Sequence, residues 1–277
     1  MMTVKYISPG GWFSFEYPAA WSEFEDSEGT FLFYNPNKWS GNFRISAFKD
    51  ASKDYARQCI AYELKENPTS TAVKLGGWDC AYSAETFQEE DVWYTTHIWV
   101  TGKDDLSFEC SFTVPKGGDR TIAEEMIRSL YIRTASDFRK KEIIPVRIAE
   151  IELINEAFDW VSTHIKKTQS KDFTSQESDI ERLQKLIDSG KIKSDQRSLW
   201  EYIGIALGTV LENEIDGMEW VTVIEGRKEY AALRFKNSDL LADPATLVWE
   251  KVKSQSNCNL LQLFEDIKEK VVNLLNT

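Results

Sequence analysis

The chain has 277 residues, of which 42% are hydrophobic and 28% charged, a composition typical of a folded globular protein and not of a disordered chain. The formal net charge is −12, and both halves are acidic. Residues 1–136 carry 13 basic and 20 acidic side chains, and residues 137–277 carry 20 basic and 25 acidic side chains. No cationic face is therefore expected for nucleic acid or for anionic lipid.

The first half predicts mainly strands. Apolar residues alternate with polar ones over residues 13–17, 43–47 and, most clearly, 106–114, which favours strands with one buried face. The apolar run at 31–34 predicts a strand buried on both faces, and 92–101 predicts a further strand joined by a turn to the one at 106. Helices are predicted over 53–66, capped by Ser52 with Tyr55, Cys59 and Tyr62 facing inward, and over 119–130.

The pattern changes near residue 134, where the charged stretch up to residue 142 predicts a linker. We therefore expect two domains, 1–134 and 140–277. In the second, apolar periodicity predicts helices over 148–161, 177–188, 196–212 and 260–275, a helix beginning at Pro244, and a hairpin of 219–225 with 228–235. Gly204 and Gly208 share one helix face, so we expect another element to approach closely there.

The stretch from Gly11 to Trp21, an aromatic strand followed by Tyr17-Pro18 and then Trp21, resembles the opening of PsbP-like (Mog-like) domains. The resemblance extends over residues 3–133. It implies an antiparallel sheet with helices on both faces and a non-enzymatic role in binding or assembly, and it carries over no functional residue. Residues 207–211 and 217–221 resemble an uncharacterised bacterial domain of unknown function that is found paired with such a domain.

The fold class is therefore predicted as α+β, with a PsbP-like antiparallel sheet between helices followed by a mainly helical domain that contains a small antiparallel hairpin.

Few residues suggest catalysis. The two histidines, His97 and His164, fall in different predicted domains, and each is expected to be structural. No phosphate-binding glycine motif and no G-x-S-x-G elbow occurs, and Asp119 after Gly117-Gly118 is expected to cap a helix. We assign no catalytic residue, no cofactor and no metal ligand. The acidic turns at 89–91 and 104–105 are expected to be solvated.

The four cysteines include no C-x-x-C pair, which predicts buried free thiols instead of a disulfide framework. The N-terminus lacks an apolar leader pattern and no run of about 18 apolar residues occurs, so a cytoplasmic protein without membrane contact is expected.

One loop suggests binding. Residues 35–41 form a polar turn that carries a tryptophan, and tryptophan is a frequent anchor at interfaces. We name Trp39, Lys38 and Asn37 as candidate binding residues. The alternative is that Trp39 folds back onto the sheet.

The favoured function is a non-catalytic protein that binds another protein or a ligand, for example an acidic inhibitor or immunity-type protein that masks a basic partner. One alternative is a hydrolytic enzyme with a carboxylate site that uses Glu109 or Glu219; a deep pocket with two carboxylates within about 10 Å would favour it. Another is a small-molecule site in a gap between the domains.

Overall fold

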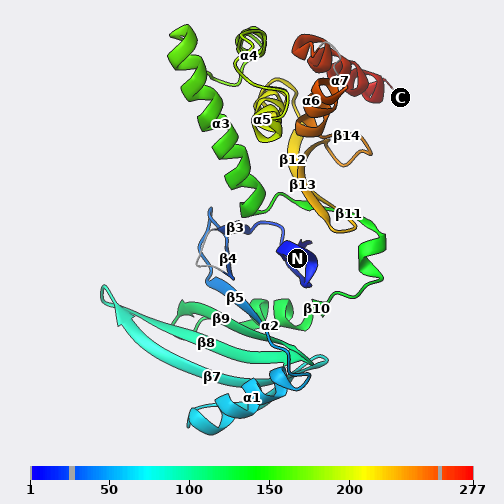
Figure 1. The fold of residues 1–277 in the computed structure, drawn as a ribbon. Helices are drawn as coiled ribbons and strands as arrows, with labels where there is room; N and C mark the ends of the chain where they lie inside the picture. Colours follow the sequence, from blue (N-terminus) through cyan, green and yellow to red (C-terminus); the bar gives the residue numbers. More distant parts are fainter. Residues whose placement is uncertain (1, 25–28, 255–257, 277) are drawn as a thin grey trace. The chain divides into compact units, whose positions relative to one another are not determined.

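The computed structural model describes residues 2–24, 29–254 and 258–276. The chain divides into two compact units, Met1–Asp137 and Phe138–Thr277. Each unit combines helices with antiparallel sheet, which confirms the predicted α+β class (Figure 1).

The first unit contains two sheets. Strands β1 (Thr3–Ile7), β2 (Phe13–Pro18) and β10 (Tyr131–Ile132) form the smaller one, in the order β1-β2-β10. The larger has the order β3-β4-β5-β9-β8-β7-β6. Its strands are β3 (Ser22–Phe24), β4 (Thr30–Tyr34), β5 (Asn42–Lys49), β6 (Thr71–Leu75), β7 (Trp78–Glu89), β8 (Val92–Lys103) and β9 (Leu106–Pro115).

Helices cover both faces of the larger sheet, as predicted. A Cβ atom on Gly102 of β8 would lie 2.9 Å from Ala56, which places helix α1 (Tyr55–Glu66) against one face. Trp99 is three positions from Gly102 on β8, so its side chain points to the opposite face of the sheet. Helix α2 (Thr121–Arg128) lies on that face, because its residues Met126 and Ile127 share a core with Trp99. The apolar face of the alternation at 106–114 is confirmed, because Phe108, Cys110 and Phe112 are buried. On the opposite face Glu109 is exposed, but Ser107 is buried, so that face is only partly in contact with water.

Three details of the prediction are wrong. Within β4 only Phe33 is buried, so this strand is not covered on both faces. Helix α1 begins at Tyr55, and the Ser52 hydroxyl accepts a hydrogen bond from Asp54 N, before the helix, so Ser52 does not cap it. Tyr62 is 67% exposed, and Ala56 is the buried residue of the helix instead.

In the described part of the second unit, five helices accompany a four-stranded sheet. The helices are α3 (Ile148–Gln169), α4 (Asp179–Asp188), α5 (Arg197–Glu214), α6 (Pro244–Lys253) and α7 (Leu260–Leu275). The sheet has the order β11-β12-β13-β14, made of β11 (Lys141–Pro145), β12 (Met218–Glu225), β13 (Lys228–Phe235) and β14 (Leu241–Ala242). The start of the predicted linker is loop and a short helical turn, but residues 141–145 form a strand that pairs with β12, with Lys141 opposite Glu225.

The two glycines of α5 allow the close approach that their spacing predicts. A Cβ atom on Gly204 would lie 2.3 Å from the carbonyl oxygen of Pro244, and one on Gly208 would lie 2.5 Å from the Trp220 ring. Helix α5 therefore contacts the first turn of α6 directly. No helix among the described residues is long and apolar enough to cross a membrane.

Candidate functional site

The predicted binding loop joins β4 to β5. The Oδ1 atom of Asn35 accepts hydrogen bonds from the backbone N–H groups of Asn37 and Lys38, at 2.9 and 3.2 Å, and so holds the turn. Trp39 is 41% exposed, its ring meets Tyr94 edge-on at 6.1 Å, and its Nε1 donates to Asn42 Oδ1 at 2.5 Å. Trp39 thus leans on the sheet while keeping part of its ring in solvent. A binding role for these three residues stays a prediction.

The histidines and Asp119 make local contacts. His97 Nδ1 lies 2.8 Å from the Tyr82 hydroxyl, and His164 Nδ1 lies 2.8 Å from the Trp160 carbonyl oxygen within α3. Asp119 Oδ1 accepts a hydrogen bond from Thr121 N at 2.9 Å, at the start of α2. Glu109 and Glu219, named for the hydrolytic alternative, are exposed residues of different units.

A cavity of about 770 Å³ lies inside the second unit. Its wall comes from α3, α5, the β12–β13 hairpin and the start of α6. The direct contact between Gly204 and Pro244 fixes two of these walls against each other. The lining includes Glu150, Leu153, Arg197, Glu201, Tyr202, Ile205, Glu225, Arg227, Lys228, Glu229, Tyr230, Ala231 and Asp243.

A buried guanidinium binds two carboxylates of the cavity lining. Arg147 is only 2% exposed; its Nε donates to Glu150 Oε2 at 2.9 Å, and its Nη2 donates to Glu150 Oε1 at 2.5 Å and to Glu229 Oε2 at 2.8 Å. The Thr222 hydroxyl also donates to Glu150 Oε2, at 2.8 Å. Burial alone would lower the pKa of Arg147, but the hydrogen bonds and charges of Glu150 and Glu229 outweigh it and hold this pKa above its ordinary value.

Charge is sorted by depth. The charged lining residues that are buried or half-buried are all carboxylates, namely Glu150, Glu201, Glu229 and Asp243, whereas the lining cations Arg197, Arg227 and Lys228 are exposed. The inner wall thus carries four carboxylates, with Arg147 behind two of them and the exposed Arg197 paired to Glu201 at 2.8 Å. The less exposed part of the lining therefore carries carboxylates, and the exposed part contains the three cations together with Glu225.

Two tyrosines add aromatic surface to this acidic interior. Burial, followed by the negative charges of Glu225 and Asp243, raises the pKa of Tyr230. The Tyr202 hydroxyl donates to Glu156 Oε1 at 2.6 Å, and this bond is the main reason that the pKa of Tyr202 is raised to about 12. Both phenols stay neutral near pH 7, so they supply ring surface and no charge.

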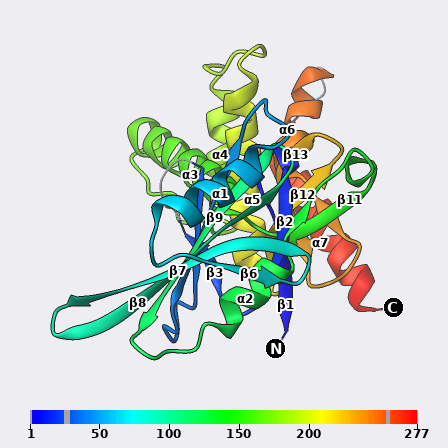
Figure 2. The same cartoon turned by 90° about the horizontal axis from the view of Figure 1, so that it is seen from below.

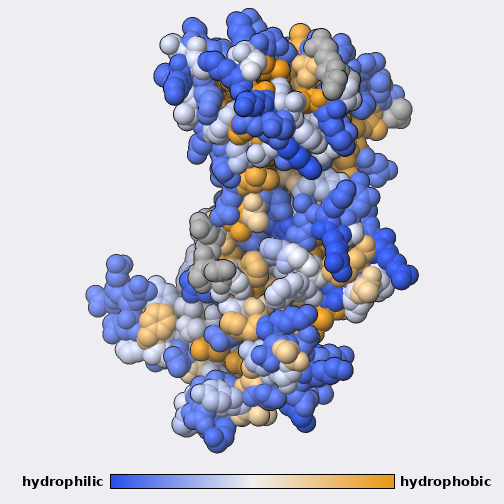
Figure 3. All heavy atoms as spheres, in the orientation of Figure 1, coloured by the Kyte–Doolittle hydropathy of each residue, from blue (hydrophilic) through white to orange (hydrophobic). Residues whose placement is uncertain are grey.

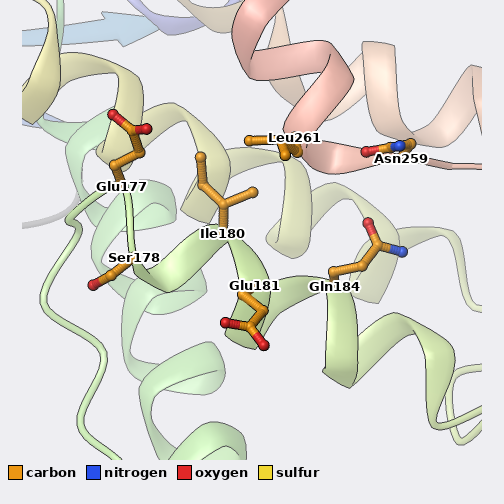
Figure 4. A pocket seen from close by; sticks show the side chains of 7 residues that line it. All are labelled: Glu177, Ser178, Ile180, Glu181, Gln184, Asn259 and Leu261. Carbon is orange, nitrogen blue, oxygen red and sulfur yellow. The ribbon is translucent and has the colours of Figure 1, made fainter.

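A smaller cavity of about 450 Å³ lies where α4 meets the start of α7 (Figure 4). Two of its polar side chains, Gln184 and Asn259, are engaged within the protein. Gln184 accepts a hydrogen bond from Leu260 N and donates to the Cys258 carbonyl oxygen, and Asn259 caps α7 through Gln262 N. These bonds join α4 to the start of α7, so this cavity is better explained as a gap in the packing of the two helices than as a ligand site.

The fold and the cavity define a two-unit α+β protein with an acidic pocket in its second unit. A family model described as domain of unknown function (DUF3805) matches residues 1–155, and the chain belongs to that family. A second model, domain of unknown function (DUF3806), matches residues 179–264 and so includes part of the cavity wall.

A crystal structure of a protein from Bacteroides thetaiotaomicron VPI-5482 is 48% identical to this chain, with a TM-score of 0.91 over 96% of this chain and 98% of that one. Two remote matches are also found. The solution structure of cyanobacterial PsbP (CyanoP) from Synechocystis sp. PCC 6803 is 14% identical, with a TM-score of 0.23 over 47% of this chain and 92% of that one. The crystal structure of LpqN, involved in cell envelope biogenesis of Mycobacterium tuberculosis, is 15% identical, with a TM-score of 0.29 over 48% of this chain and 91% of that one. TM-scores this low support no functional argument. No curated protein matches the chain.

The sequence contained one overlooked signal for this site. Glu150 falls on the buried stripe of α3 that continues through Ile154, Ala157 and Val161. A carboxylate on an inward helix face requires a buried partner, and Arg147 lies three positions earlier. Nothing local indicated that Glu229 would join them, because that contact spans 82 positions.

Proposed function

We propose that the second unit binds a small organic cation in this cavity and that the protein is a non-catalytic binding protein. The sorting of charge by depth carries the proposal: a ligand that leaves water for the interior meets four carboxylates there and exposed cations at the entrance. A cation at this depth is attracted more strongly than at the surface, because less water screens it.

The size and lining favour an organic ligand. A volume of about 770 Å³ falls in the range of small-molecule sites, roughly 300 to 1,000 Å³. Leu153, Ile205 and the rings of Tyr202 and Tyr230 provide apolar surface for a hydrocarbon body. The faces of the two phenol rings are also suited to a positively charged amine.

The test compares two small molecules of similar shape and opposite charge, phenethylamine and hydrocinnamate. Isothermal titration calorimetry on the full chain should detect binding of the amine and much weaker binding of the carboxylate. Tighter binding of hydrocinnamate would overturn the proposal.

A matched pair of variants locates the site. Asp243 accepts a hydrogen bond from Thr246 N at 2.9 Å, and asparagine preserves such a cap while removing the charge. Asp243→Asn should weaken phenethylamine binding several-fold. Glu219→Gln removes the same charge from an exposed site of the same unit and should leave the affinity unchanged. Equal effects of both variants would contradict a specific site.

The hydrolytic alternative has one observation in its favour. Glu150 and Glu229 both accept hydrogen bonds from Arg147 Nη2, so two carboxylates of the cavity lie within the separation of about 10 Å that a carboxylate-based hydrolytic site requires. Against it, both oxygens of Glu150 accept hydrogen bonds from Arg147 or Thr222, so this carboxylate is engaged within the protein and is not free to act on a substrate. Release of nitrophenol from a panel of nitrophenyl glycosides, lost in Glu229→Gln, would support this alternative over the binding function.

A further inference from the structure

Part of one edge of the seven-stranded sheet has no strand beside it. Strand β6 pairs only with the first residues of β7, from Trp78 to Tyr82. The rest of β7, Ser83–Glu89, pairs with β8 on its inner side. Among the described residues of the first unit, no strand pairs with its outer side. Figures 1 and 2 both show the far end of the β7–β8 hairpin projecting from the sheet.

Two hydrogen bonds show which backbone groups point outward. The Asp79 carbonyl oxygen accepts from Thr101 Oγ1 of β8, and the Tyr82 carbonyl oxygen accepts from Thr71 Oγ1 of β6. Odd-numbered residues of β7 therefore direct their backbone groups toward β8, and even-numbered ones direct them to the outer side, because the direction alternates along a strand. The open edge thus presents the N–H and C=O groups of Ala84, Thr86 and Gln88.

The side chains along this edge carry a charge pattern. Glu85, Phe87 and Glu89 lie on one face of the strand and are all exposed, and Glu90 and Asp91 follow in the turn. Phe87 is 40% exposed and stacks on Tyr94 at 5.6 Å. The end of the hairpin is accordingly covered mostly by hydrophilic residues (Figure 3).

This pattern disfavours a second copy of the chain as occupant. An antiparallel copy centred on Phe87 would place Glu85 against Glu89 twice, and like charges directly opposite each other are destabilising. The same carboxylates attract a strand of opposite charge, and an apolar side chain between two cations would lie beside Phe87.

We propose that the outer edge of β7, residues 83–89, receives an extended segment of a basic partner protein, whose side chains on one face alternate cation, apolar, cation. Backbone hydrogen bonds to Ala84, Thr86 and Gln88 supply the pairing, and Glu85, Phe87 and Glu89 select the sequence. This surface belongs to the first unit and is independent of the cavity.

The probe is an acetylated and amidated peptide, Thr-Lys-Thr-Val-Thr-Lys-Thr, titrated into the full chain by calorimetry. Its control replaces both lysines by glutamate. We expect saturable binding below about 1 mM for the basic peptide and none for the acidic one. Hydrogen exchange should show new protection of the amides of Ala84, Thr86 and Gln88 when the basic peptide is bound.

Two variants separate backbone pairing from charge attraction. Thr86→Pro removes an outward N–H group, which an edge strand tolerates, and Thr86→Val removes the same hydroxyl but keeps that N–H. Thr86→Pro should weaken peptide binding about tenfold, as expected for one lost hydrogen bond, while Thr86→Val should match the wild type. Equal affinity of the two variants, binding of both peptides alike, or no binding at 1 mM or so would each overturn the proposal.

Discussion

The hydroxyl of Tyr82 on β7 lies 2.8 Å from Nδ1 of His97 on β8 and also accepts a hydrogen bond from Arg120, at the start of α2. Arg120 in turn binds Glu124, which also binds Arg128. With the arginine as one donor, the phenol can give its own proton to Nδ1 of a neutral His97.

This arrangement predicts how stability responds to acid. Burial, and next the charge of Arg120, lower the pKa of His97, and Glu124 opposes them in part. Between the unfolded value, about 6.5, and the lower folded value, the unfolded chain binds a proton that the folded chain does not. The free energy of unfolding should therefore decrease as the pH falls below the unfolded value. In His97→Gln, the melting temperature should depend less on pH between about 7.5 and about 5 than it does in the wild type, as measured by calorimetry. An identical pH dependence in wild type and variant would contradict this account.

Removing the guanidinium behind the cavity should destabilise the second unit strongly. Arg147→Met leaves Glu150 and Glu229 buried or half-buried without their partner, and such changes cost about 3–5 kcal/mol. Calorimetry of the full chain should show one transition at a clearly lower temperature. The control replaces Glu150 and Glu229 by leucine in the same variant, which should recover much of the loss, because no uncompensated charge remains. A neutral effect of Arg147→Met alone would show that the network is not closed to water.

The contact between α5 and α6 should tolerate no side chain at Gly204. In Gly204→Ala the new Cβ atom would lie 2.3 Å from the Pro244 carbonyl oxygen, so the helices must separate, at a cost of about 1–3 kcal/mol. Urea unfolding measures this loss. Gly77→Ala serves as the control, because no heavy atom lies within 4 Å of its Cβ position. Similar stability of both variants would mean that α6 shifts without cost.

Thiol reactivity should single out one cysteine. Cys80, Cys110 and Cys258 are buried, and burial is the first cause of the raised pKa of each, whereas Cys59 on α1 is only half-buried. Ellman's reagent should therefore modify one thiol rapidly in the native chain and all four in urea. Cys59→Ser should abolish the rapid phase, and a rapid phase that survives would show that another thiol opens easily to solvent.

Much of the fold was predictable because its signals are local. The alternation of Leu106 to Val114 fixed both the strand and its buried face, and the helix at 260–275 has the bounds that its periodicity predicts. The helix at 53–66 was harder, since its weak apolar stripe left the choice between Ala56 and Tyr62 to tertiary packing. The start of strand β11 falls in the predicted linker because Lys141 and Glu142 are charged, and the pairing of this strand with β12 is a long-range contact that no local pattern indicates.

The cavity itself was not predictable from local patterns. It is formed by segments whose positions in the chain run from Ala149 to Thr246, and each segment alone reads as an ordinary amphipathic helix or hairpin. Only Glu150, a charge on a buried stripe, indicated that something polar lay inside. The loop at Trp39 is predicted to bind a partner from its composition alone, because it is a polar turn that carries a tryptophan, and this role stays a prediction.

The reach of Arg147 also connects ligand binding to folding. Its hydrogen bonds join the start of α3 to Glu229 on β13, 82 positions later, and through Glu150 to Thr222 on β12. The acidic interior therefore exists only once the helix and the hairpin have come together, and a partly unfolded second unit has nothing for a cation to bind. A ligand that recognises only the assembled pocket adds its binding free energy to the stability of the folded state, by about 2.7 kcal/mol at a hundredfold excess over Kd. The melting temperature of the chain can thus report a ligand before any activity is known.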